Sequence, residues 1–143
     1  MPTSIGNFFM RAIICSPLHA LLGDNLAVIT VRGHKSGKQY STPINVTQQN
    51  GDWVVVSLRS RQWWRNLRRG QTARLHVAGK DQVVQGKVIE EHAAVVTGLA
   101  DYFRRNPSYA KYYGIHLAAE GQPDMTELTR VADERILIRL TPT

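Results

Sequence analysis

Alternating apolar and polar residues predict β-strands in the middle and at the end of the chain. The stretch 26–32, LAVITVR, is rich in β-branched residues. The stretch 72–78, TARLHVA, places apolar side chains at every second position, and ERILIRL at 134–140 repeats this pattern. A period of two is typical of strands that bury one face. These stretches therefore predict a sheet with one face toward a core.

Three further stretches predict strands with special features. Residues 39–48, QYSTPINVTQ, contain Pro43, which must lie on an edge strand or at a bulge. NGD at 50–52 is a hairpin signal, and WVVVSL at 53–58 follows it. Because 53–58 is almost wholly apolar, we expect this strand to be central in the sheet.

The region from residue 79 to residue 107 predicts a hairpin followed by a helix. GKD at 79–81 turns the chain, and 82–91 returns as a long strand in which Gly86 predicts a bulge. Residues 92–105 have helical apolar spacing, and Asn106-Pro107 ends that helix. The tyrosine-rich residues 108–115 are expected to form a short helix or a loop.

Apolar residues near the N-terminus predict an amphipathic helical segment over residues 1–23. Residues 5–15 carry an apolar stripe, Ser16-Pro17 suits the start of a second short helix, and Gly23 suits its end. We expect this segment to pack on the body of the domain. Weak membrane association of the same helix is the alternative, although only Arg11 supplies a full positive charge there.

Five or six strands joined mainly by hairpin signals predict an antiparallel sheet. The expected fold class is α+β, mainly β, as a small closed or split β-barrel capped by short helices. The length of 143 residues predicts one domain over 1–143.

The charge balance favours an anionic partner. Lys and Arg number 18 against 11 Asp and Glu, so the formal net charge is +7. Cys15 is the only cysteine, which fits a cytoplasmic location, and the first nine residues make a poor signal peptide. No apolar run approaches the roughly 20 residues that span a bilayer.

Several kinds of chemistry lack their motifs. The five histidines are scattered without metal-ligand spacing, so no metal site is expected. Gly33 and Gly37 have three residues between them, and Gln39 follows Lys38, so the turn does not fit a nucleotide-triphosphatase loop. A serine nucleophile lacks its elbow motif.

The glycine-containing turn at 33–38 remains a candidate anion site. Two glycines permit left-handed backbone conformations, so that successive N–H groups could point into one concavity. Arg32, Lys35 and Lys38 add charge, and Ser36 adds a hydroxyl. The alternative is a soluble basic hairpin turn.

The segment 58–70, LRSRQWWRNLRRG, combines two tryptophans with five arginines. It predicts a short helix ending at Gly70. On an α-helix Trp63 and Leu67 share a face, while Trp64 shares its side with Arg68, so both indoles cannot be centred on the buried stripe. The segment predicts either a stacking wall beside an anion site or a core helix with a solvated arginine face.

Tyr109, Tyr112 and Tyr113 follow the helix break in NPSYAKYYGI. A tyrosine beside a pocket can donate a hydrogen bond or a proton, which makes these residues candidates for acid chemistry. Packing of half-buried rings is the alternative.

Four motifs in order resemble the deazaflavin-dependent nitroreductase family, also called deazaflavin-dependent quinone reductases. They are GHKSG followed by Thr-Pro, GDWVVVS, WWRNL and PSYAKY, within a resemblance that runs from about residue 19 to residue 140. The resemblance implies a split β-barrel related to flavin-binding split barrels. It also implies bound coenzyme F420, whose tail carries a phosphodiester and γ-linked glutamates.

The resemblance also implies the roles of particular residues. Lys35, Ser36 and Gly37, with Lys38 beside them, would hold the tail phosphate, and Thr42 and Pro43 would lie along the ring system. Ser57, Trp63, Trp64 and Asn66 would line the pocket. Tyr109 and Tyr112 would be catalytic, facing the substrate to protonate or orient it. The implied reaction is hydride transfer from the reduced deazaflavin to a quinone, enone or nitro-compound.

This chain departs from the family pattern at several positions. Tyr40 stands where many members have arginine, Trp64 stands where many have tyrosine, and LRSRQ at 58–62 replaces a longer loop, as in a short-loop branch. An FMN-dependent oxidoreductase on the same fold is therefore an alternative. A non-catalytic cofactor carrier or a single-stranded nucleic-acid protein is another, with Trp63 and Trp64 as stacking platforms.

The expected partner is a small-molecule electron acceptor. No specific nucleic acid is expected, because the turn at 33–38 and the tyrosine segment would then have no use. A homodimer is expected only by analogy with related barrels.

Overall fold

A computed structural model describes residues 26–33 and 35–143 of the chain. The helices expected within residues 1–23, and Cys15, lie outside the described residues. The described residues group into two compact units. The sheet unit contains 26–33, 35–56, 61–88 and 138–143, and the helical unit contains 57–60 and 89–137. The prediction of one domain over 1–143 stays a prediction.

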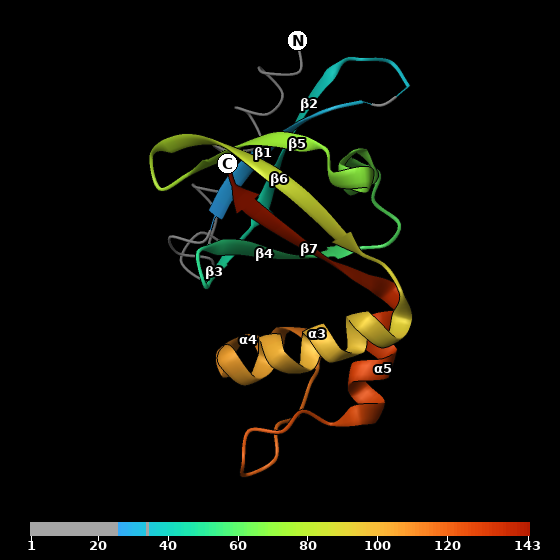
Figure 1. Cartoon of the computed structure of the whole chain (residues 1–143). Helices are drawn as coiled ribbons and strands as arrows, with labels where there is room; N and C mark the ends of the chain where they lie inside the picture. The colour runs from blue at the N-terminus through green and yellow to red at the C-terminus, as the bar shows by residue number, and fades with distance from the viewer. Residues whose placement is uncertain (1–25, 34) are drawn as a thin grey trace. The chain divides into compact units, whose positions relative to one another are not determined.

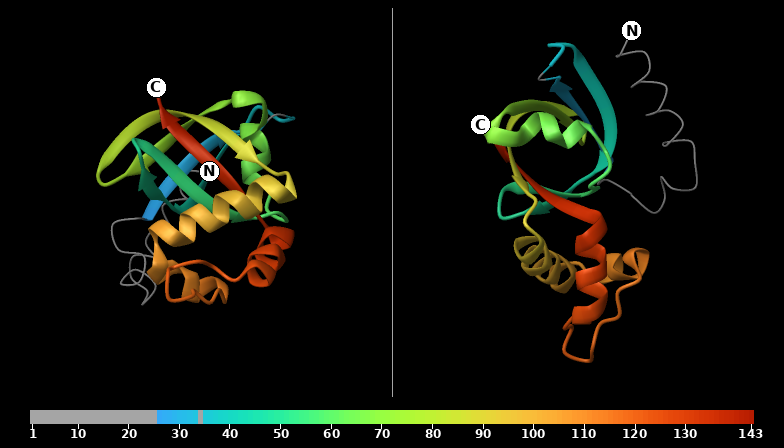
Figure 2. Two further views of the ribbon diagram at one scale, coloured as in Figure 1. Left: turned by 60° about the horizontal axis from the view of Figure 1, so that its bottom comes forward. Right: turned by 90° about the vertical axis from the view of Figure 1, so that its right-hand side faces the viewer.

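Seven strands form one antiparallel sheet that curls into a half barrel, as the right-hand view of Figure 2 shows (Figures 1 and 2). The order across the sheet is β2-β1-β5-β6-β7-β4-β3. The strands are β1 (Leu26–Arg32), β2 (Gln39–Asn45), β3 (Thr47–Gln49), β4 (Asp52–Leu58), β5 (Thr72–Val77), β6 (Lys80–Ile89) and β7 (Arg135–Pro142). The predicted antiparallel split-barrel class is confirmed, with seven strands in place of five or six.

Period-two patterns explain the best-predicted strands. In β1 the side chains of Ala27, Ile29 and Val31 are buried, and the residues between them are more exposed. In β5 the same alternation buries Ala73, Leu75 and Val77. β1 pairs with β2 on one side and with β5 on the other. The inward faces of these strands form the core of the sheet unit.

Two predictions about strand position have different outcomes. Pro43 lies on β2, which is at an edge of the sheet, so the prediction of an edge position is confirmed. The strand predicted over 53–58 is an interior strand, because β4 is paired with β7 on one side and with the short edge strand β3 on the other; it lies next to the edge and not in the middle of the sheet. Apolar residues on both faces of a strand indicate that both faces are covered, but they do not show how far the strand lies from the edge of the sheet.

No bulge forms at Gly86 in the pairing between β5 and β6. The pairing between β5 and β6 keeps one register up to Thr72 opposite Gln85, and the Gly86 N–H then donates to the Gln71 carbonyl at 3.0 Å. A Cβ at Gly86 would lie 3.0 Å from the Cβ of Leu67. Glycine is used there because another side chain packs directly on the strand.

The helical unit contains α3 (His92–Arg105), α4 (Pro107–Ala110), the 3-10 turn η3 (Lys111–Tyr113) and α5 (Met125–Glu134). α3 has the predicted bounds, and Asn106 separates it from α4 as expected. α3 packs against α5 with Val95, Leu99 and Phe103 buried.

Helix α5 was not predicted from the pattern. Its N-terminal signal is present in the sequence, because the Asp124 side chain accepts a hydrogen bond from the Glu127 N–H at 2.9 Å. At its other end, the Arg59 side chain donates two bonds to the Ala132 carbonyl, at 2.9 and 3.0 Å. A cation there donates to a carbonyl of the last turn and complements the helix dipole.

Candidate functional site

The Trp/Arg segment forms η2 (Trp63–Gly70), a 3-10 helix that ends at the predicted Gly70. A 3-10 helix has three residues per turn, so residues i and i+3 share a face. Trp63 therefore aligns with Asn66, and Trp64 aligns with Leu67. The α-helical pairing of Trp63 with Leu67 is wrong for this reason.

Both tryptophans of η2 are buried, although two adjacent indoles of an α-helix could not both be centred on one buried stripe. Trp63 is 8% exposed and Trp64 is 2% exposed, and Leu67 is fully buried. The indole Nε1 of Trp63 is buried without a hydrogen-bond partner. Two adjacent indoles can be buried because β1 packs against η2 on one side and Trp64 lies under arginine side chains on another.

The turn between β1 and β2 is closed by its own hydrogen bonds. The Gly33 N–H donates to the Lys38 carbonyl at 2.7 Å, and the Gly37 N–H donates to the Gly33 carbonyl at 2.8 Å. The Lys38 N–H donates to the Ser36 Oγ at 3.2 Å. Only Gly37 of the two glycines is left-handed, at φ 71°. These three amides serve the turn, so an anion there is met by side chains and not by a cradle of these N–H groups.

Tyr40 is fixed beside this turn. Its hydroxyl lies 3.1 Å from the Ser36 Oγ, within hydrogen-bond distance. A Cβ at Gly33 would lie 2.7 Å from the Tyr40 ring, so glycine makes room for that ring. Tyr40 therefore places an aromatic ring as a wall beside this turn.

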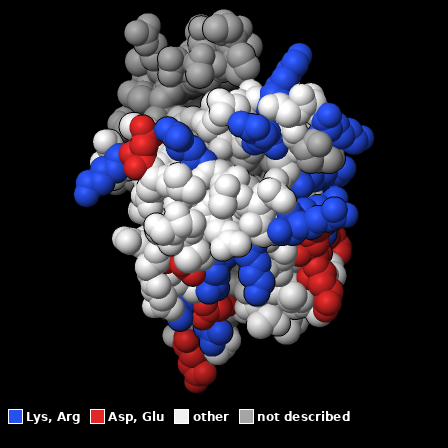
Figure 3. Space-filling model, turned by 45° about the horizontal axis from the view of Figure 1, so that its top comes forward, with Lys and Arg blue, Asp and Glu red and all other residues white. Residues whose placement is uncertain are grey.

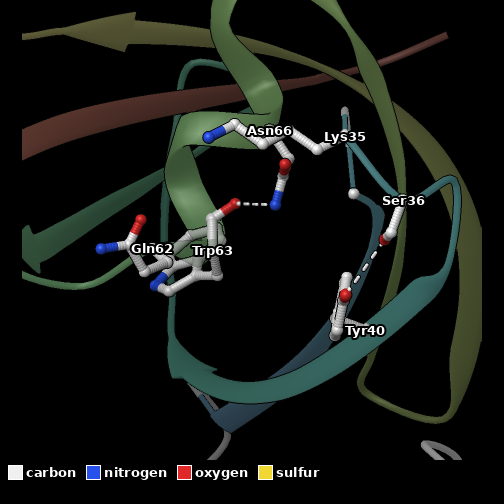
Figure 4. A pocket seen from close by; sticks show the side chains of 7 residues that line it. Lys35, Ser36, Tyr40, Gln62, Trp63 and Asn66 are labelled. Carbon is white, nitrogen blue, oxygen red and sulfur yellow. Dashed lines mark hydrogen bonds between the residues drawn. The ribbon is translucent and has the colours of Figure 1, made fainter.

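A pocket of about 440 Å³ lies between this turn and η2 (Figure 4). We call it the aromatic pocket, and its described lining residues are Gly33, Lys35, Ser36, Tyr40, Gln62, Trp63 and Asn66. Figure 4 shows the Lys35 side chain reaching from the turn toward η2. The Asn66 amide donates to the Trp63 carbonyl at 3.3 Å, which orients it. Two rings, one cation and two side-chain amides suit a flat polar ring system.

A second pocket, of about 560 Å³, shares Gly33 and Asn66 with the first. We call it the arginine pocket, and its described lining residues are Arg32, Gly33, Gly37, Arg65, Asn66, Arg68, Arg69, Gln71 and Thr72. Four of these are arginines, and no carboxylate is among them. Such a lining attracts an anion.

Trp64 supports two of these arginines. The guanidinium carbons of Arg65 and Arg68 lie 5.5 and 5.1 Å from the centre of the Trp64 ring. These are cation–π distances, so the indole face holds both side chains. Trp64 is not among the residues that line either pocket.

The sequence-predicted residues of the sheet unit therefore separate into three groups. Lys35, Ser36, Trp63 and Asn66 meet in the aromatic pocket, and Gly37 lines the arginine pocket. The Thr42 hydroxyl accepts a bond from Arg61 at 2.9 Å. Neither Lys38, Thr42 nor Pro43 is among the described lining residues.

Ser57, Tyr109 and Tyr112 belong to the helical unit, and their predicted roles stay predictions. The Ser57 Oγ is buried without a hydrogen-bond partner. Tyr109 stacks on Tyr102 with ring centres 6.0 Å apart, and Tyr112 is 62% exposed.

Tyr113 differs from these tyrosines. Burial raises the pKa of the Tyr113 hydroxyl; nearby Arg135, whose guanidinium carbon lies 4.8 Å from the ring centre, acts in the opposite direction. Tyr113 therefore stays protonated and is a poor acid.

Sequence reasoning missed the roles of Tyr40, Gln62 and the arginine pocket. For the arginines of this segment, the sequence leaves open an anion site and a solvated face of a helix, and it does not single out Arg68 and Arg69. The backbone is kinked at this arginine pair, because Arg69 has the left-handed φ of 66° and Arg68 is also non-helical. Such a kink in an arginine pair cannot be read from apolar periodicity.

The sequence model of the F420H(2)-dependent quinone reductase family matches residues 10–114, which is more than half of the chain. The chain belongs to this family. The family resemblance stated from the four motifs is confirmed, and with it, at the level of the family, the expected oxidoreductase class and the cofactor F420. No curated protein sequence matches the chain.

Solved structures support the fold at low sequence identity. A protein of unknown function from Agrobacterium tumefaciens is 15% identical with a TM-score of 0.54; the match covers 91% of this chain and 56% of that one. This chain thus spans little more than half of that protein. A putative 5-nitroimidazole antibiotic resistance protein from Bacteroides thetaiotaomicron is 11% identical, with a TM-score of 0.53 and coverages of 85% and 75%.

A third structure is described as an F420-H2 dependent reductase. It is 18% identical with a TM-score of 0.50, and the match covers 80% of this chain and 93% of that one. At these identities the three structures establish the fold.

The described residues offer neither a metal site nor a membrane-spanning helix. No group of three or more His, Cys, Asp or Glu side chains gathers there in a way that could hold a metal ion. Among the described helices none is long and apolar enough to cross a membrane. Figure 3 shows Lys and Arg side chains, in blue, at several separate places on one face of the molecule.

Proposed function

We propose that this protein is an F420-dependent oxidoreductase that reduces a small activated acceptor, of the quinone, enone or nitro class. The observation that carries the proposal is the aromatic pocket, which joins Lys35, Ser36, Trp63 and Asn66 in a chain of this family. The nitroreductase activity and the identity of the acceptor are part of the proposal.

The residues present fit a deazaflavin. The Trp63 and Tyr40 rings give the pocket two aromatic walls for a flat ring system, and Asn66 supplies an amide at its edge. Lys35 and the arginine pocket beside it supply positive charge for an anionic tail. A neutral ring joined to a charged tail needs this combination of one aromatic and one basic pocket.

The protein's own residues would bind and orient the reactants. Lys35 would contact the tail phosphate by a charge-assisted hydrogen bond, and Ser36, already bonded to Tyr40, would hold that side of the pocket in shape. Trp63 would exclude water from one face of the ring. Alignment of two reactants in a dry site supplies much of the acceleration in such reactions.

When bound, reduced F420 supplies a hydride from C5 of its ring. An acceptor that receives a hydride also needs a proton, and Tyr109 and Tyr112 are the residues we propose to deliver or orient it. Tyr112 is the better candidate, because its exposed side chain can reach solvent while Tyr109 stacks on Tyr102.

Cytoplasmic location and a homodimer remain predictions. Cell fractionation tests the first, and light scattering of the purified protein tests the second.

A titration series tests the proposed function. Binding of F420, FMN and a short single-stranded oligonucleotide is measured at moderate salt by fluorescence and calorimetry. We expect F420 to bind most tightly. Tight oligonucleotide binding without a response to either flavin would refute the proposed enzyme function. Preference for FMN would replace F420 by FMN as the proposed cofactor.

The variant Lys35→Ala tests one proposed contact in the same titration. Loss of a charge-assisted contact should weaken F420 binding by roughly 1.5–3 kcal/mol. Lys80→Ala is the matched control, since Lys80 is an exposed residue of β6 that lines neither pocket. Equal affinities for the two variants would remove Lys35 from the site.

A further inference from the structure

We infer that Arg61 is a specificity-determining residue for the electron acceptor, and that it favours an acceptor with a carboxylate or another acidic oxygen group beside its reducible ring. The inference rests on the proposed function and deepens it, because it names the charge of the substrate and adds no contact to the cofactor. It starts from the hydrogen bond that the Arg61 side chain donates to the Thr42 hydroxyl at 2.9 Å.

Arg61 is held one strand position beyond the aromatic pocket, although it is not among the described lining residues. Tyr40, which lines the pocket, is paired with Val31 of β1, and Thr42 is paired with Ile29. Both partners on β1 are buried. Because directly paired residues project to one face of a sheet, the side chains of Tyr40 and Thr42 lie on the same side of β2. Alternate residues of a strand are about 7 Å apart, so Arg61 on Thr42 is a close neighbour of the Tyr40 wall.

The arginine pocket and Arg61 lie on opposite sides of Tyr40 along this part of the chain. Gly37 in the turn lines the arginine pocket, Tyr40 lines the aromatic pocket, and Arg61 contacts Thr42 further along β2. An anionic tail that occupies the arginine pocket therefore extends away from Arg61. The proposed contacts of the cofactor tail leave this guanidinium for a second ligand.

No described carboxylate of the sheet unit neutralises Arg61. The described residues of that unit contain two carboxylates, Asp52 and Asp81. The Asp52 carboxylate lies 3.7 Å from the Arg139 side chain, and the Asp81 carboxylate lies 2.9 Å from the His76 ring. The positive potential beside the aromatic pocket is thus available to an anionic substrate.

The Arg61 guanidinium is oriented but keeps donors for a ligand. Its Nη2 donates to the Thr42 hydroxyl, which fixes one end of the side chain. A guanidinium carries five N–H groups in one plane, so others can donate in parallel to the two oxygens of a carboxylate. Gln62, the next residue along the chain, lines the aromatic pocket. An acceptor that stacks on the cofactor ring at this side can present an acidic substituent to Arg61.

The experiment compares a quinone that bears a propionate side chain with its methyl ester, which has the same ring and no charge. Steady-state kcat/KM is measured for each with saturating reduced F420, at low and high salt. We expect kcat/KM to be about fivefold higher for the acid, as for one exposed ion pair, and this ratio to fall toward one as salt rises. In Arg61→Gln the ratio should be close to one at low salt.

Three further variants separate the charge of Arg61 from its position and from the net charge. Arg74→Gln removes an exposed arginine of β5 that lines neither pocket, and the ratio should keep its wild-type value. Thr42→Val removes the hydroxyl that positions Arg61 and should lower the ratio. Thr42→Ser keeps a hydroxyl and should preserve the preference for the acid.

The outcomes are distinguishable from those of the proposed function. A wild-type protein that reduces neither quinone with F420 refutes the proposed function and this inference with it. Reduction of both quinones at equal kcat/KM, or an unchanged ratio in Arg61→Gln, overturns this inference alone. An unchanged ratio together with weaker F420 binding in that variant would assign Arg61 to the cofactor.

Discussion

The aromatic pocket and the arginine pocket share two lining residues but differ in their side chains. The first has the rings of Trp63 and Tyr40 and one cation, Lys35, whereas the second has four arginines. Both use η2 as a wall. The comparison teaches that a 3-10 helix can turn two adjacent indoles to different uses: Trp63 lines the aromatic pocket, while Trp64 supports two arginines of the other pocket.

The largest expected effect is that of Trp63→Ala, which breaks the aromatic pocket. Loss of a nearly buried indole should lower the free energy of unfolding by about 3–5 kcal/mol and abolish measurable deazaflavin binding. Urea unfolding and a fluorescence titration measure the two quantities. Trp53→Ala, which removes an indole outside both pockets, should keep binding; equal loss in both variants would contradict a specific wall.

Gly86→Ala should disturb both pockets together, because it acts on the position of η2. The new Cβ would lie 3.0–3.2 Å from three Leu67 atoms, and overpacking of this kind costs about 1–3 kcal/mol of stability. Chemical unfolding measures the cost. If the contact is the cause, the double variant with Leu67→Ala should be less destabilised than the sum of the single changes.

Tyr112→Phe should alter neither pocket. The side chain is 62% exposed, so stability should change by less than about 0.5 kcal/mol. Turnover should fall by about 10²-fold if the hydroxyl delivers the proton, with F420 affinity unchanged. Steady-state kinetics and a parallel titration measure this split, and unaltered turnover would reassign Tyr112 to a structural role.

The smallest effect is expected at Glu127, which lines neither pocket. Its carboxylate accepts bonds from the His116 N–H at 2.7 Å and from the ring Nδ1 at 2.8 Å. The backbone bond, and then the side-chain bond, lower the pKa of Glu127. A lowered pKa stabilises the folded state above the ordinary pKa of a glutamate, and this contribution is lost as pH falls through the lowered value.

Glu127→Gln should therefore reduce the melting temperature at neutral pH and lose that difference in acid. Thermal melts from neutral to acid pH compare the wild type with this variant. Glu120→Gln, at an exposed position, is the control and should give no such dependence. A difference that persists at the lowest pH would assign the effect to packing.

Sequence reasoning succeeded where one pattern extends over a whole element. β1 and α3 have their predicted bounds, because their apolar residues repeat at one period from end to end. It said less about β4, which lies next to the edge of the sheet, and about Gly86, where the reason for glycine is the Leu67 side chain from another element. Contacts between distant segments carry no local signal.

The candidate site shows the same limit. Lys35, Ser36, Trp63 and Asn66 were named in advance through the family motifs, and they share one pocket. Which arginines would line one pocket was not foreseen, because Arg32, Gly33 and Gly37 meet the residues of 65–72 only in the folded sheet unit. The family resemblance implies that Trp64 lines the pocket, whereas in the structure Arg65 and Arg68 lie over its ring.

The left-handed backbone at Arg69 has a consequence for the history and engineering of this protein. Glycine adopts that conformation without the cost of roughly 1–2 kcal/mol that other residues meet. Selection for thermal robustness alone would favour glycine at position 69, whereas selection for an anionic ligand would retain arginine. At residue 69, thermal stability and ligand binding thus favour different amino acids. Variant libraries screened only by melting temperature would tend to replace this arginine by glycine.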